Sequence, residues 1–167
     1  FNRSGTATYL RTRDVKGVSI IQGDRNDKKD IEKIDFSKYD TVVDMCLFFP
    51  SQFDLIEHLI PEETNYIFVS SGAADNRYMH NFGEYAYDKK KVEIRLQESD
   101  LNYKIVRPSY IVGQGNHRPR LGYYMNKIIN REHIEVAGNG LNKINVVFVQ
   151  DVVDCLEELV YDKVNKP

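Results

Sequence analysis

The sequence predicts an α/β fold built on a parallel sheet, and three observations support this prediction. Short apolar runs of strand length recur along the chain, and stretches with helical spacing of apolar residues alternate with them. Such alternation favours parallel strands joined by crossover helices. Polar or turn-forming residues directly follow several of the apolar runs. Because ligands bind beyond the carboxyl ends of strands in such sheets, functional residues are expected at these positions.

Length and composition indicate one globular domain. The chain has 167 residues, of which 41% are hydrophobic and 29% are charged, as is typical of a soluble protein with a hydrophobic core. The formal net charge of −2 gives no electrostatic reason to expect nucleic acid or an anionic membrane as the main partner. Cys46 and Cys155 lie far apart and outside any metal-type cluster, so no metal site is expected. Without a secretory segment or an apolar run of transmembrane length, we expect a cytoplasmic protein.

The first part of the chain is expected to hold two strands and a short helix. Residues 17–22 are rich in β-branched side chains and are followed by the turn signal Gly23-Asp24. Residues 27–39 contain two isoleucines three positions apart, which favours a short helix. Residues 41–47 form an apolar run with the length of a buried strand.

The middle of the chain continues the alternation. Ser51-Gln52-Phe53-Asp54 has capping-box spacing with Asp in place of Glu, which predicts a helix over 51–60. A second buried strand is expected at 66–69, and it runs directly into Ser70-Ser71-Gly72. After a loop, a longer helix is expected over 84–98.

The last part adds three strands and two helices. A strand is expected at 103–106, a helix at 121–131 and a strand at 133–137. A short strand at 146–149 is then followed by an amphipathic helix over 150–160, where apolar residues recur at helical spacing.

The helix over 84–98 carries two overlapping Tyr-x-x-x-Lys pairs, Tyr85 with Lys89 and Tyr87 with Lys91. Residues four apart share a helix face, so in either pair the ammonium can lie near the phenol. A nearby positive charge favours phenolate and lowers the pKa of a tyrosine, which makes the pair a candidate general acid/base.

Helical phase favours the first pair. Tyr85 and Lys89 share a stripe with Val92 and Leu96, as expected for a helix that packs on a sheet and presents its polar pair at the edge. The other pair shares its stripe with a single apolar residue. The alternative interpretation is that Tyr85 is a half-buried aromatic residue and that the lysines form a solvated face.

Four motifs in this order resemble those of the short-chain dehydrogenase/reductase superfamily. They are the strand end Ser70-Ser71, the Tyr85 and Lys89 pair, Val106-Arg107-Pro108, and Gly113-Gln114-Gly115-Asn116. The sequence is most similar to the extended branch, the NAD-dependent epimerase/dehydratase family, and to its atypical relatives. The similarity covers nearly all of the chain, and Tyr85 precedes Glu93 by the eight positions usual in that family.

The resemblance implies a Rossmann-like doubly wound parallel sheet that is incomplete at the N-terminus. The glycine-rich phosphate loop that opens this fold is absent from the sequence, so the chain is expected to be an interior fragment of a longer protein. The implied organisation is one NAD(P)-binding domain over 1–167, with parts of a small substrate-binding region around 113–145.

The resemblance also implies the catalytic roles. Tyr85 would be the acid/base, Lys89 would lower the pKa of Tyr85 and hold a nicotinamide ribose, and Ser71 would hydrogen-bond the substrate oxygen. Hydride transfer from a carbinol requires removal of the hydroxyl proton, and an ionisable phenol beside a hydroxyl donor suits that task.

NAD or NADP is the implied cofactor. Asp24 resembles the residue that meets the adenine amino group, and Arg25 lines the same pocket. Arg3 lies where an arginine favours the extra phosphate of NADP, although a loop arginine can also be merely solvated. The expected cofactor-binding residues are Arg3, Ser4, Asp24, Arg25, Met45, Cys46, Leu47, Ser70, Lys89, Pro108, Ser109 and Tyr110.

The implied substrate is a small molecule, expected to be a nucleotide sugar. Ser71, Arg118 and Arg120 are its candidate binding residues, and the two arginines could grip a phosphate or simply face solvent. Gly72-Ala73 replaces the acidic pair with which dehydratases of the family eliminate water, so epimerisation or reduction is favoured over dehydration. A homodimer is a possible assembly.

A second hypothesis is that the protein has this fold but does not catalyse a reaction. Asp44-Met45-Cys46-Leu47 stands where the family usually has small residues beside the cofactor, which resembles the atypical members. Such a protein would be a dinucleotide-binding sensor or an RNA-associated binding protein. A third possibility is a folded remnant without activity.

Overall fold

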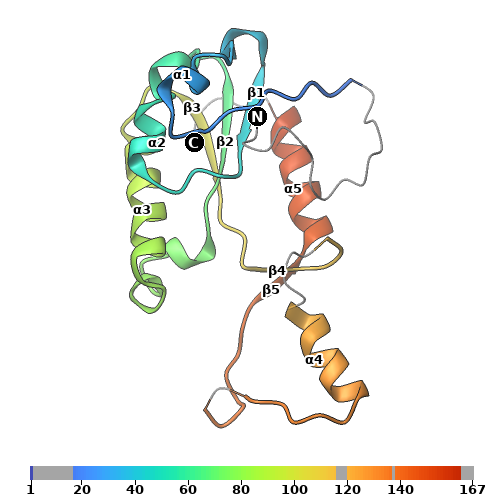
Figure 1. Ribbon diagram of the computed structural model, residues 1–167. Helices are drawn as coiled ribbons and strands as arrows, with labels where there is room; N and C mark the ends of the chain where they lie inside the picture. The colour runs from blue at the N-terminus through green and yellow to red at the C-terminus, as the bar shows by residue number, and fades with distance from the viewer. Residues whose placement is uncertain (2–16, 116–119, 137, 163–167) are drawn as a thin grey trace.

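A three-stranded parallel sheet forms the centre of the protein. The computed structural model describes residues 1, 17–115, 120–136 and 138–162. The strands β1 (Thr41–Asp44), β2 (Asn65–Val69) and β3 (Asn102–Val106) lie side by side in the order β1-β2-β3 (Figure 1). Their register pairs Val42 with Tyr66 and Tyr66 with Tyr103. All three strands therefore end at the same edge of the sheet.

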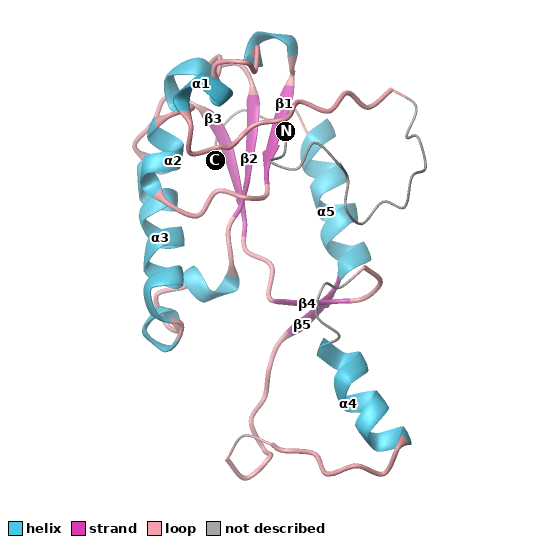
Figure 2. Cartoon of the chain, in the orientation of Figure 1, coloured by secondary structure: helices cyan, strands magenta, loops and turns pink. Residues whose placement is uncertain are grey.

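Helices cover both faces of this sheet (Figure 2). The helices α2 (Pro50–Asp54) and α3 (Gly83–Gln97) lie on one face, and α5 (Val149–Tyr161) lies on the other. The Asn65 side chain of β2 donates a hydrogen bond to the Leu159 carbonyl of α5 at 2.8 Å. The predicted α/β, Rossmann-like fold with a parallel sheet wound on both sides is confirmed.

The core lies between the sheet and the α2–α3 face. All five residues of β2 are buried, as expected for a central strand with helices on both sides. On α3, Val92 and Leu96 are fully buried, which follows from their four-residue spacing. The buried hydrophobic cluster consists of Ile31, Phe36, Leu47, Phe53, Ile56, Ile60, Tyr66, Phe68, Val92, Leu96 and Leu101.

A smaller unit lies beyond the carboxyl ends of β1 to β3. The strands β4 (Tyr110–Val112) and β5 (Val146–Phe148) form a separate parallel pair, and α4 (Arg120–Ile129) projects from it (Figure 1). The short α1 (Lys28–Ile31) packs near α2. Single 3₁₀ turns complete the described elements at Phe36–Lys38, Glu57–Leu59, Gly72–Ala74 and Met79–Asn81. The separation of a 113–145 substrate region stays a prediction.

Several predicted elements were wrong in extent or type. Residues 17–22 contain only an isolated bridge at Gln22, and residues 133–136 form no strand. Val18 and Ile20 are exposed, so the apolar run at 17–22 has no neighbouring strand in the described part to bury it. The strand at 110–112 was not predicted, because three residues carry little pattern and their pairing partner lies far along the chain.

Three predicted elements differ from the structure in their extent. The strand expected over 41–47 ends at Asp44, whose carboxylate accepts a hydrogen bond from the Cys46 backbone N–H at 3.1 Å and turns the chain. The helix expected over 51–60 begins at Pro50, a residue suited to the first helical position, and is interrupted after Asp54. The helix expected in 27–39 is likewise limited to one turn, α1, followed by a separate 3₁₀ turn.

Candidate active site

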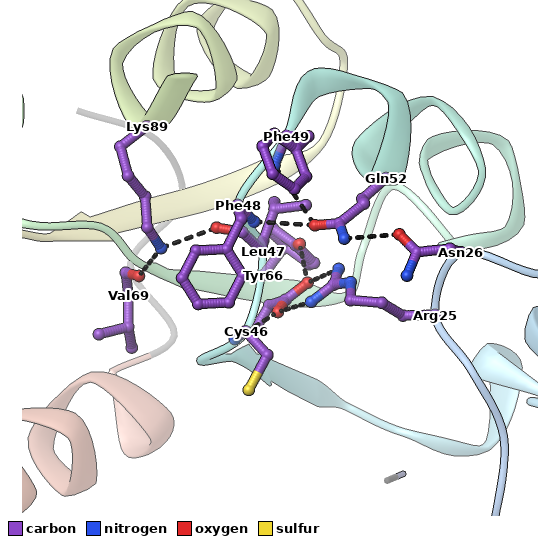
Figure 3. Close-up of polar contacts among 11 residues, drawn as sticks. Arg25, Asn26, Cys46, Leu47, Phe48, Phe49, Gln52, Tyr66, Val69 and Lys89 are labelled. Carbon is purple, nitrogen blue, oxygen red and sulfur yellow. Dashed lines mark hydrogen bonds and ion pairs between the residues drawn. The ribbon is translucent and has the colours of Figure 1, made fainter. Parts of the chain in front are cut away.

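Lys89 joins α3 to the carboxyl ends of β1 and β2. Its Nζ donates hydrogen bonds to the Leu47 carbonyl at 2.7 Å and to the Val69 carbonyl at 3.1 Å (Figure 3). The same nitrogen lies 4.8 Å from the ring centroid of Phe48 and 4.9 Å from that of Phe68. Only 2% of Lys89 is exposed. The amine is therefore a buried cation that is satisfied by backbone carbonyls and aromatic faces.

Burial changes the proton affinity of this amine. Desolvation lowers the pKa of Lys89 to about 8, and the negative charge of nearby Asp44 opposes that fall only in part. Lys89 thus carries its positive charge near neutral pH and loses it at a lower pH than an ordinary lysine.

Tyr85 lies one turn before Lys89 on α3 and stands at the surface. Its exposed fraction of 45% almost equals the 44% of Tyr87, so burial does not distinguish the two tyrosines. Contact does distinguish them, because the ring of Tyr85 packs at a centroid distance of 6.3 Å against Phe48, which also covers Lys89. Within the described residues, no hydrogen bond joins Tyr85 to Lys89 or to Ser71. The acid/base role of Tyr85 stays a prediction.

Two side-chain contacts fix the loop that carries Phe48. Asp44 accepts from the Cys46 backbone at the start of the loop. The buried Gln52 side chain accepts from the backbone N–H groups of Phe48 at 2.8 Å and Phe49 at 3.3 Å (Figure 3). The aromatic ring over Lys89 is therefore held by a structured loop.

Ser71 and Ser70 follow β2 and have different roles. Ser71 caps the 3₁₀ turn Gly72–Ala74, and its Oγ accepts from the Ala73 backbone N–H at 3.2 Å. Ser70 is buried and donates its hydroxyl to Glu93 at 2.7 Å. The Ser70 side chain is therefore directed to α3, and cofactor contact by this hydroxyl stays a prediction.

Glu93 is a fully buried carboxylate between α3 and the ends of β2 and β3. Arg107 donates to it from Nε at 2.7 Å and from a terminal nitrogen at 2.6 Å, beside the hydrogen bond from Ser70. Lys90 adds an ion pair at 3.4 Å. Burial by itself would raise the pKa of Glu93, but the hydrogen bonds from Arg107 and Ser70 outweigh burial and lower the pKa.

A second buried network lies at the end of β1. Arg25 donates two parallel hydrogen bonds of 2.8 Å to Asp44, and the Tyr66 hydroxyl donates to the same carboxylate at 2.9 Å. Burial would raise the pKa of Asp44, but Arg25 and Tyr66 lower it on balance. Burial and the Asp44 charge together raise the pKa of Tyr66 well above its usual value. Arg25 is thus committed to Asp44, which neutralises its charge.

The other predicted residues are less strongly tied to this edge. The Asp24 carboxylate accepts from the backbone and side chain of Asn26 at 2.9 and 2.8 Å. Met45 and Cys46 are exposed, whereas Leu47 is fully buried and contributes its carbonyl to Lys89. Pro108 accepts from the Gly72 backbone N–H at 2.9 Å, while Ser109 is half-buried and Tyr110 begins β4. Arg3, Ser4, Arg118 and the side chain of Arg120 lie outside the described residues.

The sequence contains signals for the two buried networks. Lys89, Val92, Glu93 and Leu96 follow the spacing of one buried helical stripe, so a glutamate there has to be paired. Asp44 ends an apolar strand and needs a partner for the same reason. The identity of each partner could not be read from spacing.

Residues 61–165 match the NAD dependent epimerase/dehydratase family. The chain belongs to this family. That result confirms the resemblance found in the sequence, and it supports NAD or NADP as the cofactor and an oxidoreductase-like enzyme as the protein type. Among curated proteins, none matches the chain.

Solved structures agree with the family at the level of the fold. A wide-type short-chain dehydrogenase/reductase from Veillonella parvula DSM 2008, in complex with NADP, has a TM-score of 0.63 at 16% identity, over 97% of this chain and 75% of that one. ChuY, an anaerobilin reductase from Escherichia coli O157:H7, has a TM-score of 0.54 at 19% identity, over 87% and 69%. The capsular polysaccharide assembling protein CapF from Staphylococcus aureus has a TM-score of 0.56 at 19% identity, over 84% and 40%. The chain thus spans between 40% and 75% of these three proteins.

The described edge fits the family's cofactor in part. Lys89 contacts Leu47, and Ser71 follows β2 at the same edge, where three parallel strands end and a dinucleotide binds in this fold. The Nε of Arg25 is a buried donor without a hydrogen-bond partner in the described part of the chain, at the side assigned to adenine. The sequence has no Gly-x-Gly-x-x-Gly turn for the pyrophosphate. The described residues thus place polar groups at the strand ends, and their contact with a cofactor stays a prediction.

Two further features are absent from the described residues. No group of three or more His, Cys, Asp or Glu residues there could hold a metal ion. None of the described helices has the length and apolar character needed to cross a membrane.

Proposed function

We propose that the protein is an NAD(P)-dependent oxidoreductase or epimerase that acts on a hydroxyl or carbonyl group of a nucleotide-sugar-like molecule. The observation that carries the proposal is the position of α3. This helix brings Tyr85 and the buried cation Lys89 to the carboxyl edge of the sheet, and Phe48 contacts both. Family membership supplies the hydride chemistry.

The residues have separate roles in this proposal. A bound nicotinamide would accept or supply the hydride. The Tyr85 phenol, exposed at the surface, takes the hydroxyl proton or returns it to a carbonyl oxygen. Ser71 donates a hydrogen bond to that oxygen, and the Phe48 ring lies against both the Lys89 charge and the Tyr85 ring.

Other chain residues would hold the cofactor. Leu47 and Pro108 lie at strand ends where backbone groups can approach a nicotinamide, and Arg25 and Asp24 lie on the side assigned to adenine. Arg3 is the proposed determinant of NADP preference, because a guanidinium can pair with a phosphate in two places.

The reaction type follows from the residues after Ser71. Gly72 and Ala73, the two residues after Ser71, carry no carboxyl group, so they offer no acid for the elimination of water. Epimerisation or reduction is therefore favoured over dehydration. CapF is named as a protein of capsular polysaccharide assembly, which is compatible with a sugar-linked substrate. We also propose a cytoplasmic location and a homodimer, the latter testable by light scattering.

The two tyrosines of α3 provide the test. Thermal shift with NAD and NADP measures cofactor binding, since a ligand specific for the native state raises the melting temperature. Turnover is then followed at the nicotinamide absorbance with UDP-sugars and simple carbonyl compounds. Tyr85→Phe should lower kcat by about 100-fold or more, as expected for the loss of a general acid/base.

Tyr87→Phe is the matched control, because Tyr87 is on the same helix and is equally exposed. It should keep turnover within about threefold of wild type, as is usual for a surface change away from the chemistry. Equal losses in both variants would remove Tyr85 from its assigned role.

One observation favours a second candidate function. Lys89 is nearly inaccessible, and backbone carbonyls occupy two of its three N–H donors, so the amine has to become more exposed before it can contact a ribose. A dinucleotide-binding sensor or an RNA-associated protein would tolerate this arrangement. It predicts a thermal shift with NAD(P) without turnover, and any RNA affinity would fall steeply with salt.

A further inference from the structure

We infer that Glu93 is a positioning residue that sets where Ser71 stands relative to α3. Its catalytic consequence rests on the proposed function, but its structural content does not. Glu93 is fully buried and touches two strand ends as well as its own helix.

Glu93 contacts the residue that precedes Ser71 and a residue that follows the neighbouring strand. One carboxylate oxygen accepts from Ser70 at 2.7 Å and from Arg107 Nε at 2.7 Å, and the other accepts from a terminal nitrogen of Arg107 at 2.6 Å. Ser70 adjoins Ser71 at the end of β2, and Arg107 follows β3. A single side chain of α3 therefore holds the ends of two neighbouring strands.

Backbone hydrogen bonds connect the residues beside Ser71 to the segment that contains Arg107. The Ser70 N–H donates to the Val106 carbonyl at 2.8 Å, and the Gly72 N–H donates to the Pro108 carbonyl at 2.9 Å. Ser71 thus lies between two bonds to the segment that continues β3, and Arg107 is in the middle of that segment. A Cβ on Gly72 would come within 3.3 Å of the Pro108 carbonyl oxygen, which shows how closely the two segments approach.

The charge of Glu93 is necessary for this arrangement. A carboxylate offers acceptor sites for Ser70 and for both nitrogens of Arg107 at once. A glutamine amide has the same shape but presents one NH₂ group, which cannot accept from a guanidinium. Glu93→Gln therefore leaves donors of Ser70 or Arg107 without their buried acceptor, and the segment around Ser71 is released.

Amide hydrogen exchange tests the inference without reference to catalysis. In Glu93→Gln, amides in 70–75 and 106–109 should exchange about tenfold faster or more, which corresponds to the loss of one charge-assisted hydrogen bond. Amides of β1, whose described residues form no hydrogen bond with Glu93, should keep their wild-type rates. Glu98→Gln, the same change at the exposed C-terminal cap of α3, is the matched control.

Two outcomes would overturn the inference. Unchanged exchange in 70–75 would show that Glu93 does not hold the strand end. Equal acceleration throughout the protein would show a general loss of stability instead of a local role. If Glu93→Gln does not fold, Ser70→Ala decides the question, because it removes only one of the contacts and should still accelerate exchange selectively in 70–75.

Kinetics tests the catalytic consequence. With NADPH and phenanthrenequinone as the probe, Glu93→Gln should lower kcat by about tenfold or more while the KM for NADPH changes less than about twofold, because a misplaced Ser71 affects the reacting oxygen. If wild-type protein does not reduce any carbonyl probe, the proposed function fails while the exchange result still decides the role of Glu93.

Discussion

Lys89 gives the protein a pH dependence that is opposite to that of a lysine whose pKa is raised by a salt bridge. The folded state holds this amine at a pKa of about 8, whereas an ordinary lysine has a value of 10.5. Between these two values the unfolded chain binds more protons than the folded protein. The free energy of unfolding contributed by Lys89 therefore rises with pH across this window.

The size of the effect follows from the same two values. The fall from 10.5 to about 8 corresponds to about 3 kcal/mol of unfavourable ionisation below pH 8. Integrated from about pH 7 to about pH 10, the proton linkage raises the free energy of unfolding by about 2 to 3 kcal/mol. Lys89→Met keeps a flexible apolar chain of similar length and cannot ionise.

Urea denaturation at a series of pH values measures the prediction. The stability of wild type minus that of Lys89→Met should increase by about 2 to 3 kcal/mol between about pH 7 and pH 10. Lys91→Met, on the exposed face of the same helix, controls for the loss of one lysine. A difference that stays flat with pH would refute the idea that Lys89 ionises within a desolvated site.

Two further predictions concern the buried charges and the core. Asp44→Asn should destabilise the protein by about 3 kcal/mol because it leaves the buried Arg25 charge without its partner, and the double variant Asp44→Asn/Arg25→Met should regain part of that loss in urea titrations. The folded pKa of Asp44 is lowered from 3.8, so the stability that Asp44 contributes is present above that pH. This stability is lost as the solution becomes more acidic and the carboxylate is protonated. Leu96→Ala should cost about 2 to 5 kcal/mol by the same method, since Leu96 is fully buried, and a loss below about 1 kcal/mol would contradict its place in the core.

The Phe48 ring contacts both residues proposed for catalysis on α3. It packs against Tyr85 and covers the Lys89 amine, and its loop is fixed by Asp44 at one end and Gln52 at the other. Access of a ribose to Lys89 therefore requires movement of a ring that is itself held by the backbone. This explains why one arrangement of residues is compatible with both an enzyme and a binding protein.

The sequence by itself determined the fold class and the orientation of α3. Alternating strand and helix patterns are local, and the buried stripe of Lys89, Val92 and Leu96 is visible from its spacing alone. The order of motifs along the chain was likewise sufficient for the family, which the match over 61–165 confirmed.

Only the tertiary structure decided what the charged groups contact. Lys89 bonds to a carbonyl 42 positions away, and Arg25 pairs with a carboxylate 19 positions away. The pairing of β4 with β5 depends in the same way on distant segments. Local periodicity fixes which face of an element is buried, but a buried polar group is satisfied by whatever the folded chain places beside it. For that reason the sequence indicated Tyr85 and Lys89 as a pair, whereas the fold directs the Lys89 amine to Leu47 and Val69.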